Sequence, residues 1–125
     1  MANPSTVNAT ASGKEVIRRH YYDGVAESAV VVLQGVADHI MTTVSIIITE
    51  RAGRADGLFH MIFYPDASAS GLYMLQNQSL PSNETFIFNE KVAITNTDVI
   101  KIVGESAGGT AGYDVWVTYI DQDFS

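Results

Sequence analysis

The chain has 125 residues, of which 46% are apolar, a net charge of −7 at pH 7, and no cysteine. This length suits one domain with a hydrophobic core, and the lack of cysteine excludes disulfides, thiolate zinc sites and cysteine catalysis. No run approaches the roughly 18 apolar residues of a membrane span, and the first residues do not form a secretory signal. We therefore expect a protein that is made in the cytoplasm and does not enter a membrane.

The charges are unevenly placed along the chain. Residues 1–22 hold three basic residues and one acidic residue, whereas residues 23–125 hold four basic and thirteen acidic ones. Affinity for nucleic acid comes mainly from Lys and Arg side chains that neutralise phosphates. The acidic body thus argues against a nucleic-acid partner. The basic N-terminal stretch is either an ordinary solvated segment or one that docks on a neighbouring protein.

The N-terminal stretch divides into an arm and a strand. Residues 1–14 are small and polar with no apolar period, which predicts an extended or disordered arm before a single domain over residues 15–125. Residues 15–22 alternate and stop at the turn pair Asp23-Gly24, as a strand does. Charged residues on both faces of this strand are typical of a sheet edge.

The clearest strand pattern lies in the middle of the chain, over residues 42–50 and 57–64. Each segment has an apolar face at period two and is rich in β-branched or aromatic residues. We expect the two segments to pair as a β-hairpin around the polar link of residues 51–56. The residues predicted to face the core are Val44, Ile46, Ile48, Phe59, Met61 and Phe63.

Shorter strand patterns surround this central pair. They cover residues 28–33, 72–75, 85–89 (with 91–94 extending or following it), 99–103 and 113–120. No segment shows a helical period of 3.6, and turn residues recur at the spacing of an antiparallel sandwich or barrel. The sequence therefore predicts an all-β protein: an antiparallel β-sandwich of about eight strands, jelly-roll or immunoglobulin-like.

Several strands carry apolar residues on both faces, so one core cannot bury them all. Ile47, Ile62, Tyr64, Trp116 and Ile120 lie on the second face of their strands. Either loops cover this second face, since exposed apolar residues are common on any protein, or it forms a contact between subunits, where aromatic residues are enriched.

The motifs of enzymes and of metal or cofactor sites are missing. His20, His39 and His60 lack the spacing of a metal site, and no nucleophile elbow accompanies the pair Asp38-His39. The acidic run at residues 121–123 lacks the glycine and glutamate of a calcium loop. We expect no enzyme activity, no cofactor, and no catalytic or metal-binding residue.

Five segments stand out by their order along the chain: Lys14–Gly24, Asp38–Ile48, Asn83–Val92, Thr97–Ile102 and Tyr113–Asp121. In this order they resemble a group of small β-sandwich structural proteins of tailed bacteriophages, especially marine phages and cyanophages. The resemblance covers about residues 14–123.

This resemblance implies a non-enzymatic virion protein. A capsid decoration or cement protein that binds and stabilises the head shell is the first expectation, and a tail, neck or fibre-base protein is the alternative. Its partners would be the major capsid protein or another virion subunit, together with copies of itself in a homotrimer. The candidate residues for binding a partner lie where the arm meets the first strand: Lys14, Arg18, Arg19, Tyr21 and Tyr22.

A carbohydrate- or receptor-binding sandwich is the second kind of function to consider. In such a protein, exposed Tyr73, Trp116 or Tyr119 would stack on sugar rings. A ligand-binding module exposes aromatic residues beside polar loops, whereas an assembly module buries them between subunits.

Overall fold

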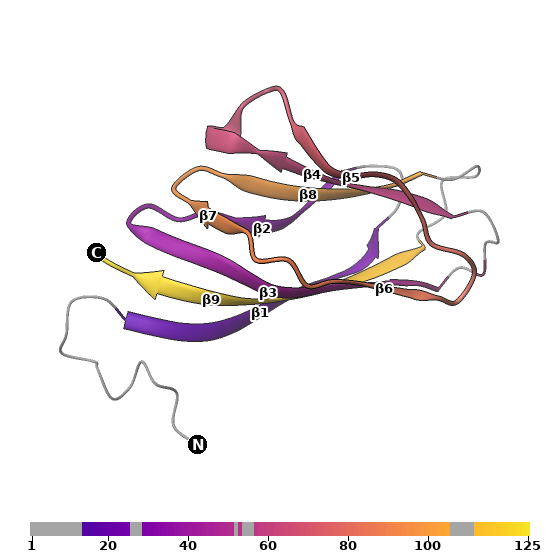
Figure 1. Ribbon diagram of the computed structural model, residues 1–125, viewed down its shortest axis with the longest axis horizontal. Coiled ribbons are helices and arrows are strands. Elements are labelled where there is room, and N and C mark those ends of the chain that lie inside the picture. The colour runs from indigo at the N-terminus through magenta and orange to yellow at the C-terminus, as the bar shows by residue number, and fades with distance from the viewer. Residues whose placement is uncertain (1–13, 26–28, 52, 54–56, 106–111) are drawn as a thin grey trace, which may run out of the picture.

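A computed structural model describes residues 14–25, 29–51, 53, 57–105 and 112–125. The described residues form nine strands and one short 3₁₀ turn, with no α-helix among them (Figure 1). The elements are β1 (Lys14–Val25), β2 (Val30–Gln34), β3 (His39–Glu50), β4 (Leu58–Tyr64), η1 (Pro65–Ala67), β5 (Leu72–Ser79), β6 (Thr85–Phe88), β7 (Ala93–Thr95), β8 (Val99–Glu105) and β9 (Tyr113–Asp123).

The strands form two antiparallel sheets, and this confirms the predicted sandwich. In sheet A the order is β1-β9-β3-β6, and β7 pairs with the other half of the β3 edge that β6 occupies. In sheet B the order is β2-β8-β4-β5. The first strand lies at the end of sheet A, as its charged faces predicted. Of the expected arm, residues 1–13 lie outside the part of the chain that the structure describes, and Lys14 is the first residue of β1.

The predicted central hairpin is wrong. β3 pairs with β9, β6 and β7 in sheet A, whereas β4 pairs with β5 and β8 in sheet B. The link between β3 and β4 therefore crosses from one sheet to the other. Alternation indicates which face of a strand is apolar, but it does not say which strand lies beside it.

The predicted core face of β3 is correct for Ile46 and Ile48 and wrong for Val44. A register shift between Thr43 and Ser45 inserts an extra residue into β3 opposite β9. Met41 and Thr43 face inward before the shift, Ile46 and Ile48 face inward after it, and Val44 is only partly buried. Such a bulge changes the phase of the alternation, because two residues on one strand oppose a single residue on the other.

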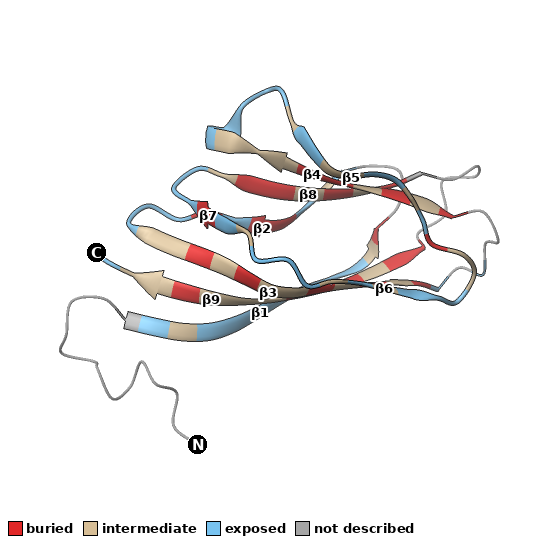
Figure 2. Ribbon diagram, in the orientation of Figure 1, coloured by how far each residue is buried: buried red, intermediate tan, exposed pale blue. Residues whose placement is uncertain are grey.

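The core lies between the two sheets, where red residues gather in Figure 2. Its largest fully buried side chains include Tyr113, Phe59, Met61 and Ile46. The Tyr113 hydroxyl donates a 2.9 Å hydrogen bond to the carbonyl oxygen of Leu58, so β9 of sheet A is tied to β4 of sheet B. A buried tyrosine is stable in a core when its hydroxyl has such a partner.

Candidate assembly surface

A row of apolar side chains crosses the outer face of sheet A. Tyr21 lies opposite Trp116, Trp116 opposite Ile47, and Ile47 opposite Ile87, so four neighbouring strands contribute one residue each. Tyr21 is 66% exposed, Trp116 43% and Ile87 55%, while Ile47 is half-buried between its neighbours. We call these four residues the apolar row. Residues directly opposite each other on one sheet face form a continuous surface.

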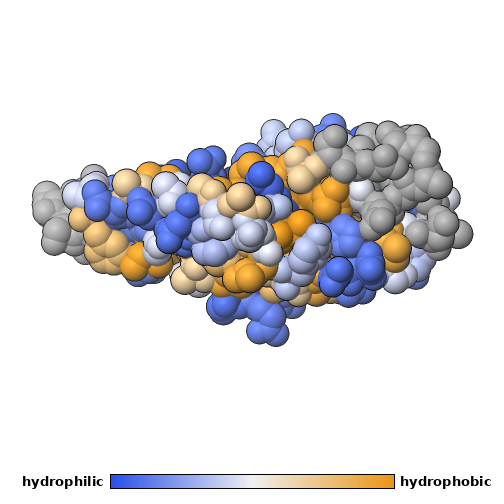
Figure 3. Space-filling view, turned by 90° about the horizontal axis from the view of Figure 1, so that it is seen from above, coloured by the Kyte–Doolittle hydropathy of each residue, from blue (hydrophilic) through white to orange (hydrophobic). Residues whose placement is uncertain are grey.

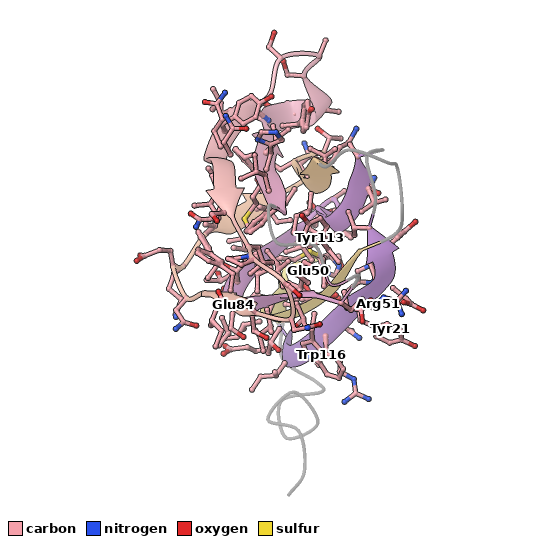
Figure 4. The ribbon with its side chains drawn as sticks, turned by 90° about the vertical axis from the view of Figure 1, so that its right-hand side faces the viewer. Tyr21, Glu50, Arg51, Glu84, Tyr113 and Trp116 are labelled. Carbon is pink, nitrogen blue, oxygen red and sulfur yellow. The ribbon has the colours of Figure 1, made fainter. Side chains whose placement is uncertain are left out.

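The aromatic end of the apolar row is ordered by ring contacts. The rings of Tyr21 and Trp116 are stacked, with centroids 6.0 Å apart and planes at 25°. The Arg19 guanidinium carbon lies 5.5 Å from the centre of the Trp116 ring, within the range of a cation–π interaction. Figure 4 shows Tyr21 and Trp116 on the outer side of the molecule, away from the interior position of Tyr113.

A shallow hollow of about 580 Å³ lies beside Tyr21 and Trp116. Arg51 binds two carboxylates at its rim: its Nη2 lies 2.9 Å from Asp23 and its Nε lies 3.2 Å from Asp114. Asp114 also accepts a 3.2 Å hydrogen bond from the backbone N–H of Gly24. The hollow therefore combines aromatic surface with a fixed group of charged side chains.

The opposite face of β1 carries an ionic cluster that belongs to the fold. Asp121, which is nearly buried, accepts a hydrogen bond from Arg18 Nε at 2.9 Å and pairs with His39 Nδ1 at 2.7 Å. His39 Nε2 lies 3.5 Å from Asp123. The pKa of nearby Tyr119 is raised, mainly because the side chain is partly buried. The Arg18 guanidinium lowers this pKa, and the Asp121 carboxylate raises it further. Arg18 thus joins β1 to β9.

The five residues proposed from the sequence to bind a partner all lie in β1. Lys14 begins the strand, and the whole stretch to Tyr22 pairs with β9 of the same chain. Arg19 and Tyr21 lie on the outer face with Trp116, whereas Arg18 and Tyr22 lie on the other face. Sequence reasoning did not single out Ile87, which the structure adds to the apolar row. The only sequence signal for it is its place between Phe86 and Phe88, which pack on the core.

The two sheets differ in how their second faces are covered. On sheet B, Ile62 is only 6% exposed because the segment after η1 lies against it. On sheet A, Trp116 and Ile87 remain exposed. Seen from the β4–β5 side, apolar side chains also reach the surface of the molecule among polar ones (Figure 3). Tyr73 of β5 is 53% exposed there, whereas Tyr119 packs partly on the core.

The described part of the chain has neither a metal-binding group of side chains nor a membrane-spanning helix. No group of three or more His, Cys, Asp or Glu side chains is placed there to hold a metal ion. The same residues include no helix that is long and apolar enough to cross a membrane.

No protein-family model matches the chain, and no curated protein matches it. Solved structures share its fold. A protein of the Bacillus endospore appendages, which form a family of disulfide-linked pili, superposes with a TM-score of 0.52 at 15% identity, covering 90% of this chain and 91% of that one. A mutant VP2 protein of infectious bursal disease virus, from derived T=1 particles, gives a TM-score of 0.53 at 9% identity, covering 88% of this chain and 32% of VP2.

A second VP2 structure, from a subviral particle, gives a TM-score of 0.51 at 11% identity over 88% of this chain and 33% of that one. The chain therefore spans about a third of the VP2 chain. At these identities the comparisons show a common β-sandwich fold. The neighbours are a pilus protein and a viral capsid protein.

Proposed function

We propose that the chain is a non-enzymatic structural subunit of a virion and that it assembles through the outer face of sheet A. The observation that carries the proposal is the apolar row, which crosses four strands of sheet A and is left uncovered by the described parts of the chain. Burial of apolar surface contributes roughly 25 cal/mol per Å² before the costs of association. The fold, shared with a capsid protein and a pilus protein, supports the same conclusion.

The finer proposal is a bacteriophage decoration or cement protein. It would bind the major capsid protein or another virion subunit, act as a homotrimer, and join the virion after synthesis in the host cytoplasm. A tail, neck or fibre-base position is the alternative within the same class. Disulfide links cannot hold copies of this chain together, because it has no cysteine.

The N-terminal stretch supplies a second contact in this proposal. Residues 1–13 would reach a neighbouring virion subunit, where an extended segment can add to an exposed sheet edge. Arg19 and Tyr21 lie on the outer face of β1, the strand that follows this segment in the chain. Deletion of residues 1–13 should leave the melting temperature unchanged and lower binding to undecorated heads. Full occupancy by the shortened chain would remove the arm from the proposal.

Native mass spectrometry of the full chain, followed by addition to bare capsids, tests the assembly role. Ile87→Glu should lower the oligomer population and capsid occupancy, because it places a charge in the apolar row. Leu72→Glu is the matched control, since Leu72 is 60% exposed on β5 of sheet B. Equal behaviour of the two variants, or a monomer that ignores every capsid and tail preparation, would contradict the proposal.

A carbohydrate-binding module is the second candidate, and the hollow beside Tyr21 and Trp116 favours it. Aromatic faces can stack on sugar rings, while the carboxylates of Asp23 and Asp114 can accept hydrogen bonds from hydroxyl groups. Trp116 is the single tryptophan of the chain, so selectively excited tryptophan fluorescence reports on this place alone. Saturable quenching by a panel of neutral oligosaccharides, lost in Asp114→Ala, would favour this candidate over assembly.

A further inference from the structure

No described strand pairs with the outer edge of β1. β1 ends sheet A, and β9 is its single sheet neighbour among the described residues. Its pairing with β9 runs in unbroken register from Lys14 to Tyr22, so the other edge presents a regular row of backbone donors and acceptors (Figure 1). Ile17 is 63% exposed on this strand. A long, regular edge is a template for pairing with another chain.

We propose that β1 of one copy pairs antiparallel with β1 of a second copy about a two-fold axis at Ile17. Sheet A then continues from one molecule into the next. The inference rests on the proposed assembly role and names the partner as an identical chain. In a larger assembly this contact would link neighbouring oligomers, because a two-fold contact joins two chains only.

The charge pattern of β1 matches this register. With Ile17 opposite its own counterpart, Glu15 of each copy faces Arg19 of the other, so two opposite-charge pairs flank an apolar pair. All three residues lie on the outer face: their β9 partners are Gln122, Ile120 and Thr118, which share the face of Trp116. Opposite charges directly across two strands stabilise their pairing, and like charges oppose it.

Three other registers that keep the outer faces together are less favourable. An axis at residue 18 or 19 places Arg18 or Arg19 opposite itself. An axis at Tyr21 would pair Arg19 with Asp23, but Arg51 already binds Asp23. The strand is also irregular there, because the register with β9 shifts between Tyr22 and Val25 and Gly24 has a φ of 79°. The charges of β1 thus favour the axis at Ile17 over these three.

A second hollow lies on the same side of the sandwich. It measures about 320 Å³, and His20 of β1, Val31 of β2 and Val36 are among the residues that line it. Val31 is 39% exposed and Val36 is 44% exposed. A second copy joined along β1 would lie beside these apolar side chains, so the contact need not stop at the strand edge.

Charge exchange tests the register. Glu15→Arg alone sets two arginines against each other in every facing pair, and Arg19→Glu alone sets two glutamates against each other. Sedimentation velocity on the full chain should show that each single variant raises the dimer dissociation constant about tenfold or more. The double exchange Glu15→Arg with Arg19→Glu should restore dimers. A mixture of the two single variants should form mixed dimers, in which one copy presents two arginines and the other two glutamates.

Crosslinking gives a readout that does not depend on charge. The chain has no cysteine, so Ile17→Cys places one thiol per molecule at the proposed axis. A short thiol-reactive crosslinker should convert this variant to covalent dimers, whereas Leu72→Cys on sheet B should stay monomeric. The inference is overturned if both variants crosslink equally, or if the single charge variants and the wild type sediment alike.

The two proposals fail separately. If Ile87→Glu disrupts assembly while the β1 variants have no effect, the outer face of sheet A carries assembly and the β1 contact is wrong. If the β1 variants behave as expected while Ile87→Glu matches Leu72→Glu, the strand pairing stands and the apolar row has no part in it.

Discussion

Gly71 decides how the second face of sheet B is covered. A Cβ atom at position 71 would lie 2.3 Å from Cγ2 of Ile62 and 2.9 Å from the Tyr64 ring. The chain therefore passes so close to Ile62 that no side chain fits between them. This close approach is the reason that Ile62 is buried although it faces away from the core.

Gly71→Ala should lower the free energy of unfolding by about 1–3 kcal/mol, because the added methyl group overpacks the contact with Ile62. Urea denaturation of the variant checks the value. The cost should shrink in an Ile62→Ala background, which provides room for the methyl group. An equal cost in both backgrounds would show that the contact is not its cause.

Tyr119 gives the fold a dependence on alkaline pH. Burial, which is the main effect, and the Asp121 carboxylate raise the pKa of Tyr119 above its ordinary value near 10, against the opposing effect of Arg18. The folded state therefore holds this proton more tightly than the unfolded state. The resulting stability is complete below about pH 10 and is lost as pH rises through the higher folded pKa.

Tyr119→Phe should accordingly lose less stability than the wild type between about pH 10 and pH 12. Urea midpoints measured across this range give the comparison, and Tyr73→Phe on the other sheet is the control. Parallel decline of all three proteins would mean that Tyr119 does not contribute to the pH dependence.

The link between β6 and β7 is attached to β3 through Thr43. The Thr43 hydroxyl donates to the carbonyl oxygen of Glu90 at 2.9 Å and accepts from the N–H of Val92 at 2.9 Å. Thr43 is fully buried and sits at the bulge of β3. The bulge thus directs a polar side chain inward, where two backbone groups of the link need partners.

Thr43→Val should cost about 1–3 kcal/mol of unfolding free energy, because it leaves both backbone groups without that partner. Thr49→Val is the matched control on the same strand: its hydroxyl contacts Thr85 at 3.1 Å on the exposed face. Its cost should stay within about 0.5 kcal/mol. Chemical denaturation of both variants distinguishes the two positions, and similar costs would contradict the role of the bulge.

The alternation of apolar and polar residues predicted where the strands lie better than it predicted which strands pair with each other. The face of β4 that holds Phe59 and Met61 and the face of β9 that holds Val115 and Val117 are buried as expected. Pairing of β3 with β9 joins residues far apart in the chain, and no local pattern encodes it. Val44 was misplaced because a bulge leaves no clear mark on the sequence.

The candidate surface was only partly predictable for a related reason. The second-face positions of Ile47 and Trp116 follow from period two, but their meeting with Tyr21 and Ile87 depends on strand order. Ile62 is covered because the segment after η1 folds back over it, and the position of that fold cannot be predicted from the sequence.

The two faces of β3 separate the core of the fold from the proposed assembly surface. Ile46 is fully buried between the sheets, while its neighbour Ile47 belongs to the apolar row on the outer face. A carboxylate at these adjacent positions therefore meets very different surroundings.

Ile46→Asp should unfold the protein, because an unpaired buried carboxylate costs several kcal/mol against a total stability of about 5–15 kcal/mol. Ile47→Asp should keep the folded circular dichroism spectrum and melt cooperatively, while its oligomer population falls. Far-UV spectra and sedimentation of both variants test this together. A folded Ile46→Asp chain with an unchanged melting temperature would disprove the assignment of the core.

The position of β9 also has a consequence for synthesis on the ribosome. β9 lies between β1 and β3, so the last of the nine described strands to be made separates two of the earliest. β1 has no partner in sheet A until residues 113–123 have emerged, and β3 lacks its longest pairing until the same moment. Sheet A can therefore close only after residues 113–123 have emerged. Until then the twelve-residue strand β1 has no partner in sheet A, and the twelve-residue strand β3 has only β6 and β7 beside it. Binding by a chaperone during this interval would protect those edges from premature association.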